Sequence, residues 1–178
     1  WYMLEGTDCF TRLDGAFTLA VVSGEELLLV RDALGERPLY YCTQSLETIL
    51  FASEIKALLE VPGYRPEVDV ESLHHYFGLN YIPGARTAFV GIRELTPGTW
   101  LEIDSGARVV GQGAFCQFAA GDGIARQSVQ QAAEESTELL RAAVERQLVS
   151  DVPVGVMLSG GLDSSALAAL YAEVRGDA

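Results

Sequence analysis

The 178-residue chain is poor in cationic residues and in long apolar runs. It has 12 Lys and Arg against 25 Asp and Glu, a formal net charge of −13. Such a chain repels nucleic-acid phosphates and anionic membrane surfaces, so we expect neither as a partner. No run reaches the roughly 20 apolar residues needed to span a bilayer, and the start shows no signal-peptide pattern. These absences favour a cytoplasmic enzyme with small-molecule substrates.

Cysteine and histidine are also scarce. The three cysteines, Cys9, Cys42 and Cys116, are widely spaced and form no Cys-x-x-Cys pair, which argues against a zinc site and against a disulfide framework. Cys9 lies inside the chain, whereas an N-terminal nucleophile needs its own α-amine as base. His74 and His75 are neighbours in a predicted helix, so their side chains point in different directions. We expect structural thiols and surface or packing histidines.

One short segment, SGGLDSS at residues 159–165, carries the clearest chemistry. The apolar residues 151–158 before it predict a buried parallel strand, and the Ala- and Leu-rich residues 164–174 after it predict a helix. Glycines at a strand-to-helix turn let the backbone approach an anion, and the free N–H groups at the helix start face that anion. The segment therefore predicts a phosphate-binding loop. The alternative is an ordinary Ser/Gly-rich turn with an Asp cap.

The loop combines hydroxyl groups with one carboxylate. The hydroxyls of Ser159, Ser164 and Ser165 can donate to phosphate oxygens. Asp163 only accepts hydrogen bonds, so it would repel bare phosphate unless a divalent cation lay between them. We therefore predict ATP as the ligand and Mg²⁺ at Asp163. The loop lacks the lysine of Gly-x-x-x-x-Gly-Lys-Ser/Thr, so it differs from the loop that holds a γ-phosphate for hydrolysis.

The loop resembles the pyrophosphate loop (PP-loop) of the N-type ATP pyrophosphatases. That superfamily includes GMP, NAD and argininosuccinate synthetases and tRNA-thiolating enzymes, so the loop alone leaves the substrate open. The resemblance implies that the loop grips the β,γ-pyrophosphate while a substrate oxygen attacks the α-phosphate, giving an adenylate. It places Leu158 in the nucleotide pocket and the metal at Asp163, and it assigns phosphate binding to Ser159, Gly160, Gly161, Ser164 and Ser165.

Five upstream segments narrow the resemblance. They are residues 13–20, 31–41, 51–58, 81–89 and 95–103. In this order they resemble the glutamine-hydrolysing asparagine synthetase family, and the resemblance spans nearly the whole chain. The family joins an N-terminal nucleophile (Ntn) glutaminase domain of stacked antiparallel sheets to an α/β domain that adenylates the aspartate side chain. Ammonia travels between the two domains and displaces AMP.

The resemblance implies an α+β fold followed by an α/β fold. The expected parts are the C-terminal part of an Ntn-type glutamine amidotransferase type 2 domain at 1–111, a linker at 112–128, and the first elements of a PP-loop ATP pyrophosphatase domain (adenine nucleotide α-hydrolase-like) at 129–178. Family members begin with a catalytic Cys and with segments that hold glutamine, and none of these occurs here. We therefore expect an internal fragment without catalytic residues of its own.

Local patterns predict the elements of the first part. Apolar strands separated by turn-rich segments predict a β-meander at 16–22, 27–31, 39–43 and 49–52. Helices at 54–60 and 70–76 and strands at 99–103 and 108–111 follow. Arg31 and Asp32 are expected to pin a turn and to have no catalytic role. Residues 129–148 show an amphipathic helical face, which we assign to packing.

The predicted function of the parent enzyme is glutamine-dependent asparagine synthesis. Aspartate, glutamine, ATP and water give asparagine, glutamate, AMP and pyrophosphate, and the chain by itself is expected to be inactive. One alternative is a β-lactam or peptide macrolactam synthetase of the same architecture, in which an internal amine replaces ammonia. A second is a non-catalytic nucleotide-binding module. Whether the parent forms a homodimer stays open.

Overall fold

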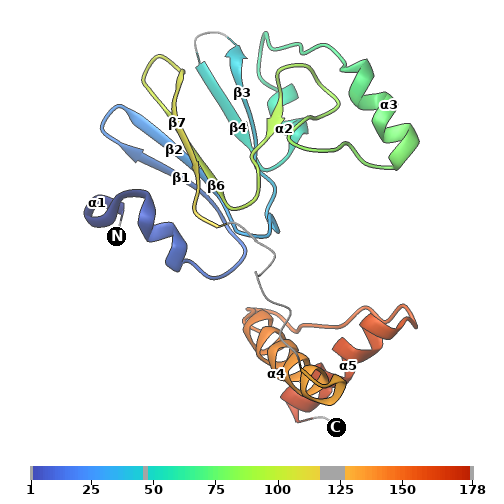
Figure 1. The fold of residues 1–178 in the computed structure, drawn as a ribbon. Helices are drawn as coiled ribbons and strands as arrows, with labels where there is room; N and C mark the ends of the chain where they lie inside the picture. Colours follow the sequence, from blue (N-terminus) through green and yellow to red (C-terminus); the bar gives the residue numbers. More distant parts are fainter. Residues whose placement is uncertain (1, 46–47, 117–126, 177–178) are drawn as a thin grey trace. The chain divides into compact units, whose positions relative to one another are not determined.

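Figure 1 shows the fold in a computed structural model, which describes residues 2–45, 48–116 and 127–176. The chain divides into two compact units, Trp1–Ala119 and Ala120–Ala178. Residues 117–126, within the predicted linker, lie outside the described residues. No helix in the described ranges combines the length and the apolar character needed to cross a membrane.

The first unit contains two antiparallel sheets with short helices. The sheets have the strand orders β1-β2-β6-β7 and β4-β3-β5. The strands are β1 (Thr18–Ser23), β2 (Glu26–Arg31), β3 (Tyr40–Ser45), β4 (Thr48–Ala52), β5 (Arg93–Glu94), β6 (Thr99–Ile103) and β7 (Val109–Ala114). The helices are α1 (Tyr2–Glu5), the 3-10 helix η1 (Gly6–Arg12), α2 (Ile55–Leu59) and α3 (Val70–Leu79).

The predicted β-meander is wrong in its connections, although its four strands lie close to the predicted positions. β1 pairs with β2 in one sheet and β3 pairs with β4 in the other. The second edge of β2 pairs with β6, and that of β3 pairs with β5. An apolar pattern indicates that a strand is partly buried, but it does not specify which distant strand lies beside it. β7 also extends to Ala114, beyond the predicted end of its strand.

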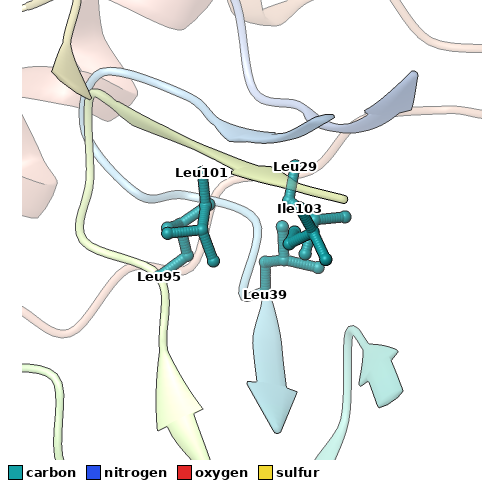
Figure 2. Close-up of a cluster of buried hydrophobic side chains, with 5 residues drawn as sticks. All are labelled: Leu29, Leu39, Leu95, Leu101 and Ile103. Carbon is teal, nitrogen blue, oxygen red and sulfur yellow. The ribbon is translucent and has the colours of Figure 1, made fainter. Parts of the chain in front are cut away.

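A leucine-rich core lies between the two sheets (Figure 2). Leu29 of β2 and Leu101 and Ile103 of β6 contribute from the four-stranded sheet. Leu39, just before β3, and Leu95, just after β5, contribute from the other sheet. None of the five is more than 4% exposed. The two sheets therefore form a face-to-face sandwich, and the first unit is a mixed α/β structure with stacked antiparallel sheets.

Helices cover the outer faces of the sandwich. Phe10 of η1 packs against Leu28 and Val30 of β2 on one side. Leu58 of α2 packs with Cys42 of β3 on the other. The layers follow the order helix, sheet, sheet, helix, which is consistent with a glutaminase domain. Neither α1 nor η1 was expected from the sequence.

The second unit contains two helices, α4 (Val129–Gln147) and α5 (Leu162–Arg175), both close to their predicted positions. α4 begins with a capping box, in which Ser128 and Gln131 each accept a hydrogen bond from the other's backbone N–H. The two helices contact each other. Arg141 of α4 forms an ion pair with Glu173 of α5 at 2.9 Å.

Residues 151–158, predicted as a buried parallel strand, form no strand in the structure. Val152 is 68% exposed and Met157 is 93% exposed. A parallel strand needs a neighbouring strand for its ladder hydrogen bonds, and residues 127–176 contain no strand that could provide them. The prediction is therefore wrong for this structure, and the α/β class of the second part stays a prediction.

Candidate phosphate-binding site

The predicted loop leads directly into the first turn of α5. Gly161 is the N-cap residue of this helix, and Asp163, Ser164 and Ser165 follow within the first turn or just after it. Gly160 has a φ of +82°, a conformation that glycine adopts readily and other residues adopt at a cost. The structure therefore brings residues 159–165 together in one turn, as predicted. Leu158, next to the turn, is 64% exposed.

Two serine hydroxyls of the loop converge on the carbonyl oxygen of Gly161, and the third, that of Ser159, contacts one of them. Ser164 Oγ and Ser165 Oγ donate to this oxygen at 3.1 and 2.8 Å. Ser159 Oγ lies 2.9 Å from Ser164 Oγ and accepts from the N–H of Gly161 at 3.4 Å. A hydroxyl has one proton and can rotate about its C–O bond. Each serine can therefore exchange its present partner for an incoming phosphate oxygen.

Backbone N–H groups provide a second set of donors at this site. No described side chain caps the N-terminus of α5. The N–H groups of the first helical turn have no acceptor within the helix, and they carry the positive end of the helix dipole. An anion placed beside Gly161 would meet these N–H groups and the serine hydroxyls together. The arrangement is therefore suited to binding a phosphate group.

Asp163 is the carboxylate of the loop. Among the residues that the structure describes, no group of three or more His, Cys, Asp or Glu side chains is placed to hold a metal ion. Mg²⁺ usually takes one or two carboxylates and completes its coordination with substrate phosphates and water. A single exposed carboxylate beside a phosphate-binding turn fits that pattern, so Asp163 could hold a Mg²⁺ ion that arrives with a nucleotide.

The cysteines have the structural character predicted for them. Cys9 and Cys42 are buried, and Cys116 is half-buried. The hydroxyl of Tyr64 donates to Cys42 Sγ at 3.2 Å. Burial, together with this contact, raises the pKa of Tyr64 well above its ordinary value. His75, by contrast, lies on α3 with Nε2 4.0 Å from the carboxylate of Glu71.

Asp32 organises the chain where it passes from one sheet to the other. Its side chain is 1% exposed and accepts hydrogen bonds from the N–H groups of Leu34, Glu36 and Arg37 at 3.0 to 3.1 Å. Burial raises the pKa of Asp32, but the backbone hydrogen bonds outweigh it, so the pKa lies below its usual value. The backbone oxygen of Asp32 also accepts from the N–H of Gly98 at 2.8 Å.

Arg31 links the segment that passes between the two sheets to residues of the second sheet. Its guanidinium donates to the carbonyl oxygens of Gly35, Arg37 and Leu95 at 2.7 to 2.9 Å and pairs with Glu94 at 2.7 Å. All these partners are residues of the first unit. The expectation that Arg31 and Asp32 pin a turn is thus confirmed.

One contact near the loop was not expected from the sequence. The hydroxyl of Tyr171 in α5 donates to the backbone oxygen of Val154, ahead of the loop. Arg175 adds a hydrogen bond to this hydroxyl at 3.3 Å and places its guanidinium 5.7 Å from the ring centre. Helical periodicity predicts that the neighbouring Leu170 is buried, as it is. It cannot show that the hydroxyl of Tyr171 contacts the backbone of residue 154.

Two families match different parts of the chain. The glutamine amidotransferase domain family matches residues 1–113, which contain the sandwich. The asparagine synthase family matches residues 135–177, which contain the predicted phosphate-binding loop. The chain belongs to the glutamine-hydrolysing asparagine synthetase family. The resemblance predicted from the sequence is therefore confirmed at the level of the family, for the glutamine amidotransferase part and for the asparagine synthase part.

Relatives from bacteria and a fungus align with nearly the whole chain. A putative glutamine-hydrolysing asparagine synthetase of Mycobacterium tuberculosis (strain ATCC 25618 / H37Rv) is 37% identical over 172 residues, which is 93% of this chain and 26% of that protein. Glutamine-hydrolysing asparagine synthetase 3 of Bacillus subtilis (strain 168) is 38% identical over 169 residues, with the same two shares. Amidase chry2 of Gibberella zeae is 33% identical over 177 residues, 97% of this chain and 26% of that protein. The chain thus spans about a quarter of the length of these relatives.

Proposed function

We propose that the protein containing this chain is a glutamine-dependent asparagine synthetase. It adenylates the side-chain carboxylate of aspartate with ATP, releases pyrophosphate, and forms asparagine with ammonia taken from glutamine. The observation that carries the proposal is the turn at residues 159–165, where serine hydroxyls and helix N–H groups converge beside one carboxylate. The two family matches, in this order on one chain, support the coupling of amidotransfer to ATP chemistry.

The loop acts on the pyrophosphate group of ATP. A carboxylate is a poor acyl donor until it is adenylated, and the departing pyrophosphate carries several negative charges. Ser159, Ser164 and Ser165 donate their hydroxyls to its oxygens, and Gly160 and Gly161 let the backbone come close. Donors that are in place before the reaction stabilise charge as it develops on the leaving group. Mg²⁺, when bound at Asp163, neutralises part of the phosphate charge.

The two units of the chain belong to the two domains of the proposed enzyme, the glutaminase domain and the ATP-binding domain. We assign residues 1–111 to the C-terminal part of the glutaminase domain, to which β7 adds the residues up to Ala114, and residues 129–178 to the start of the ATP-binding domain, with the rest of the predicted 112–128 segment as linker. No residue of this chain is assigned to glutamine hydrolysis itself. We place the protein in the cytoplasm, with aspartate, glutamine and ATP as its small-molecule substrates.

The test uses the protein at its full natural length. AMP and pyrophosphate release are followed with aspartate and either glutamine or ammonium, and asparagine is quantified. We expect aspartate-dependent release with both nitrogen donors. Asp163→Ala should reduce pyrophosphate release by orders of magnitude, whereas Glu145→Ala, which removes an exposed carboxylate from α4, should leave it unchanged. Absence of any aspartate-dependent release in the wild type would sink the proposal.

One relative that aligns with nearly the whole chain, Amidase chry2, is not named an asparagine synthetase, so we also consider a second candidate. An enzyme of the same architecture could activate a different carboxylate, or could close a β-lactam or peptide macrolactam with an internal amine in place of ammonia. The same assay separates the candidates, because pyrophosphate release would then require another carboxylate and would ignore aspartate. A non-catalytic nucleotide-binding module would bind ATP without releasing pyrophosphate under any of these conditions.

A further inference from the structure

The phosphate-binding loop lies between two segments of the chain, and these differ in how they are held. The segment after it is α5, whose Leu170 is buried and whose Glu173 pairs with Arg141. The segment before it, residues 151–158, has no ladder hydrogen bonds in the structure and is largely exposed. Ser159 itself contacts Ser164 and the N–H of Gly161, so the direction from which the chain enters the loop depends on whatever holds this earlier segment in place.

One side chain of α5 makes that connection. Tyr171 lies nine residues after Leu162, about two and a half helical turns into α5. Its hydroxyl donates to the carbonyl oxygen of Val154, and the contact is partly buried. Arg175, one turn further on, contacts both the hydroxyl and the face of the ring. The tyrosine thus has Arg175 as a second partner besides Val154.

The hydrogen bond between Tyr171 and Val154 shortens the segment ahead of α5 that can change its backbone conformation. Tyr171 and Val154 are 17 positions apart, and the phosphate-binding loop lies between them. With Val154 held, only residues 155–161 link the contact to the helix start. That stretch contains Gly155 and Gly160, which restrict the backbone least of all residues. A contact at its start therefore removes much of the backbone freedom of this stretch and supports the contacts of Ser159 with Ser164 and Gly161.

We propose that Tyr171 is a positioning residue for the phosphate-binding loop. Its hydroxyl holds residue 154 against α5, so the hydroxyl of Ser159 and the N–H groups of the first helical turn face the same phosphate. This inference rests on the proposed function, since it assigns Tyr171 a role in binding the pyrophosphate part of ATP. Tyr171 itself touches neither substrate nor the reacting atoms.

Tyr171→Phe in the full-length enzyme removes the hydroxyl and keeps the ring. Losing one hydrogen bond weakens an equilibrium by about two- to tenfold, so we expect the KM for ATP to rise by that factor. The loop is ordered when ATP binds and its donors themselves are unchanged in this variant, so kcat should change less than KM. Glutamine hydrolysis measured without ATP should be unchanged. Tyr81→Phe, which removes a hydroxyl from a tyrosine that is 59% exposed in the first unit, is the matched control.

The outcomes separate this inference from the proposed function. If the wild type shows no ATP-dependent pyrophosphate release, the proposed function fails and the positioning role fails with it. If the wild type is active and Tyr171→Phe has the KM of Tyr81→Phe, the positioning role alone is overturned. Equal losses in ATP-dependent synthesis and in glutamine hydrolysis would also overturn it, because they indicate general destabilisation. Should Tyr171→Phe fail to fold, Arg175→Gln decides by the same criterion, with a smaller rise in KM expected.

Discussion

Asp32→Ala should destabilise the first unit by about 3 kcal/mol. The side chain accepts three backbone hydrogen bonds and is 1% exposed. A hydrogen bond to a charged acceptor contributes about 1.5–3 kcal/mol, so three independent bonds would give considerably more. They share one carboxylate, however, and their donors belong to the exposed residues Leu34, Glu36 and Arg37, whose N–H groups can take water instead. The expected loss is therefore close to that of one or two such bonds.

Urea unfolding followed by tryptophan fluorescence measures this loss, since Trp100 lies in β6 of the same sheet as β2. Asp8→Ala is the control, because Asp8 is exposed and surface substitutions usually stay within about 0.5 kcal/mol. Asp32→Asn should be intermediate, because the amide can still accept from Leu34 and Glu36 but presents its NH₂ group to the N–H of Arg37. Equal free energies of unfolding for Asp32→Ala and Asp8→Ala would refute the claim that the Asp32 carboxylate stabilises the segment between the two sheets.

Two further predictions concern the first unit. Gly98→Ala should lower its melting temperature more than Gly63→Ala, because both glycines have positive φ but only at Gly98 would the new Cβ lie 2.8 Å from a backbone oxygen, that of Cys116. The hydrogen bonds from the Arg86 guanidinium, above all, hold the pKa of Asp69 at about 2. The unfolded value is about 3.9, so this stabilisation is present above roughly pH 4 and is lost as the pH falls towards 2. Asp69→Asn should remove that part of the acid dependence in urea unfolding measured across this range, and an unchanged acid dependence would contradict the assignment.

Local sequence patterns located the strands of the first unit but did not determine how they pair. Leu27 to Val30 form an apolar run without alternation, because β2 is covered on both faces, by η1 and by the second sheet. Such a run is compatible with many neighbours. The pairing with β6 depends on contacts between residues 70 or more positions apart, such as Val30 with Trp100. No window of a few residues contains that information.

The candidate site shows the same division between local and distant information. The turn at residues 159–165 and the helix that follows could be predicted because both depend on a short contiguous motif, and the phosphate chemistry of this motif stays a prediction. The strand expected at residues 151–158 does not form in this structure, since a strand exists only beside another strand and residues 127–176 contain none. Tyr171 could not be found from the sequence, because its role depends on a contact with a backbone oxygen, and every residue type has such an oxygen.

The two units also differ in what holds them together, and this affects how the loop is ordered. The first unit has buried clusters on both sides of its sheets, whereas Leu170 is the one buried apolar side chain within residues 127–176. Leu158 and Leu162, which flank the glycines of the loop, are 64% and 86% exposed. Structure that packed over these two leucines would restrain the loop from its apolar side. Tyr171 already restrains it through the backbone, so the two effects should add, and the loop should bind phosphate most tightly where both operate.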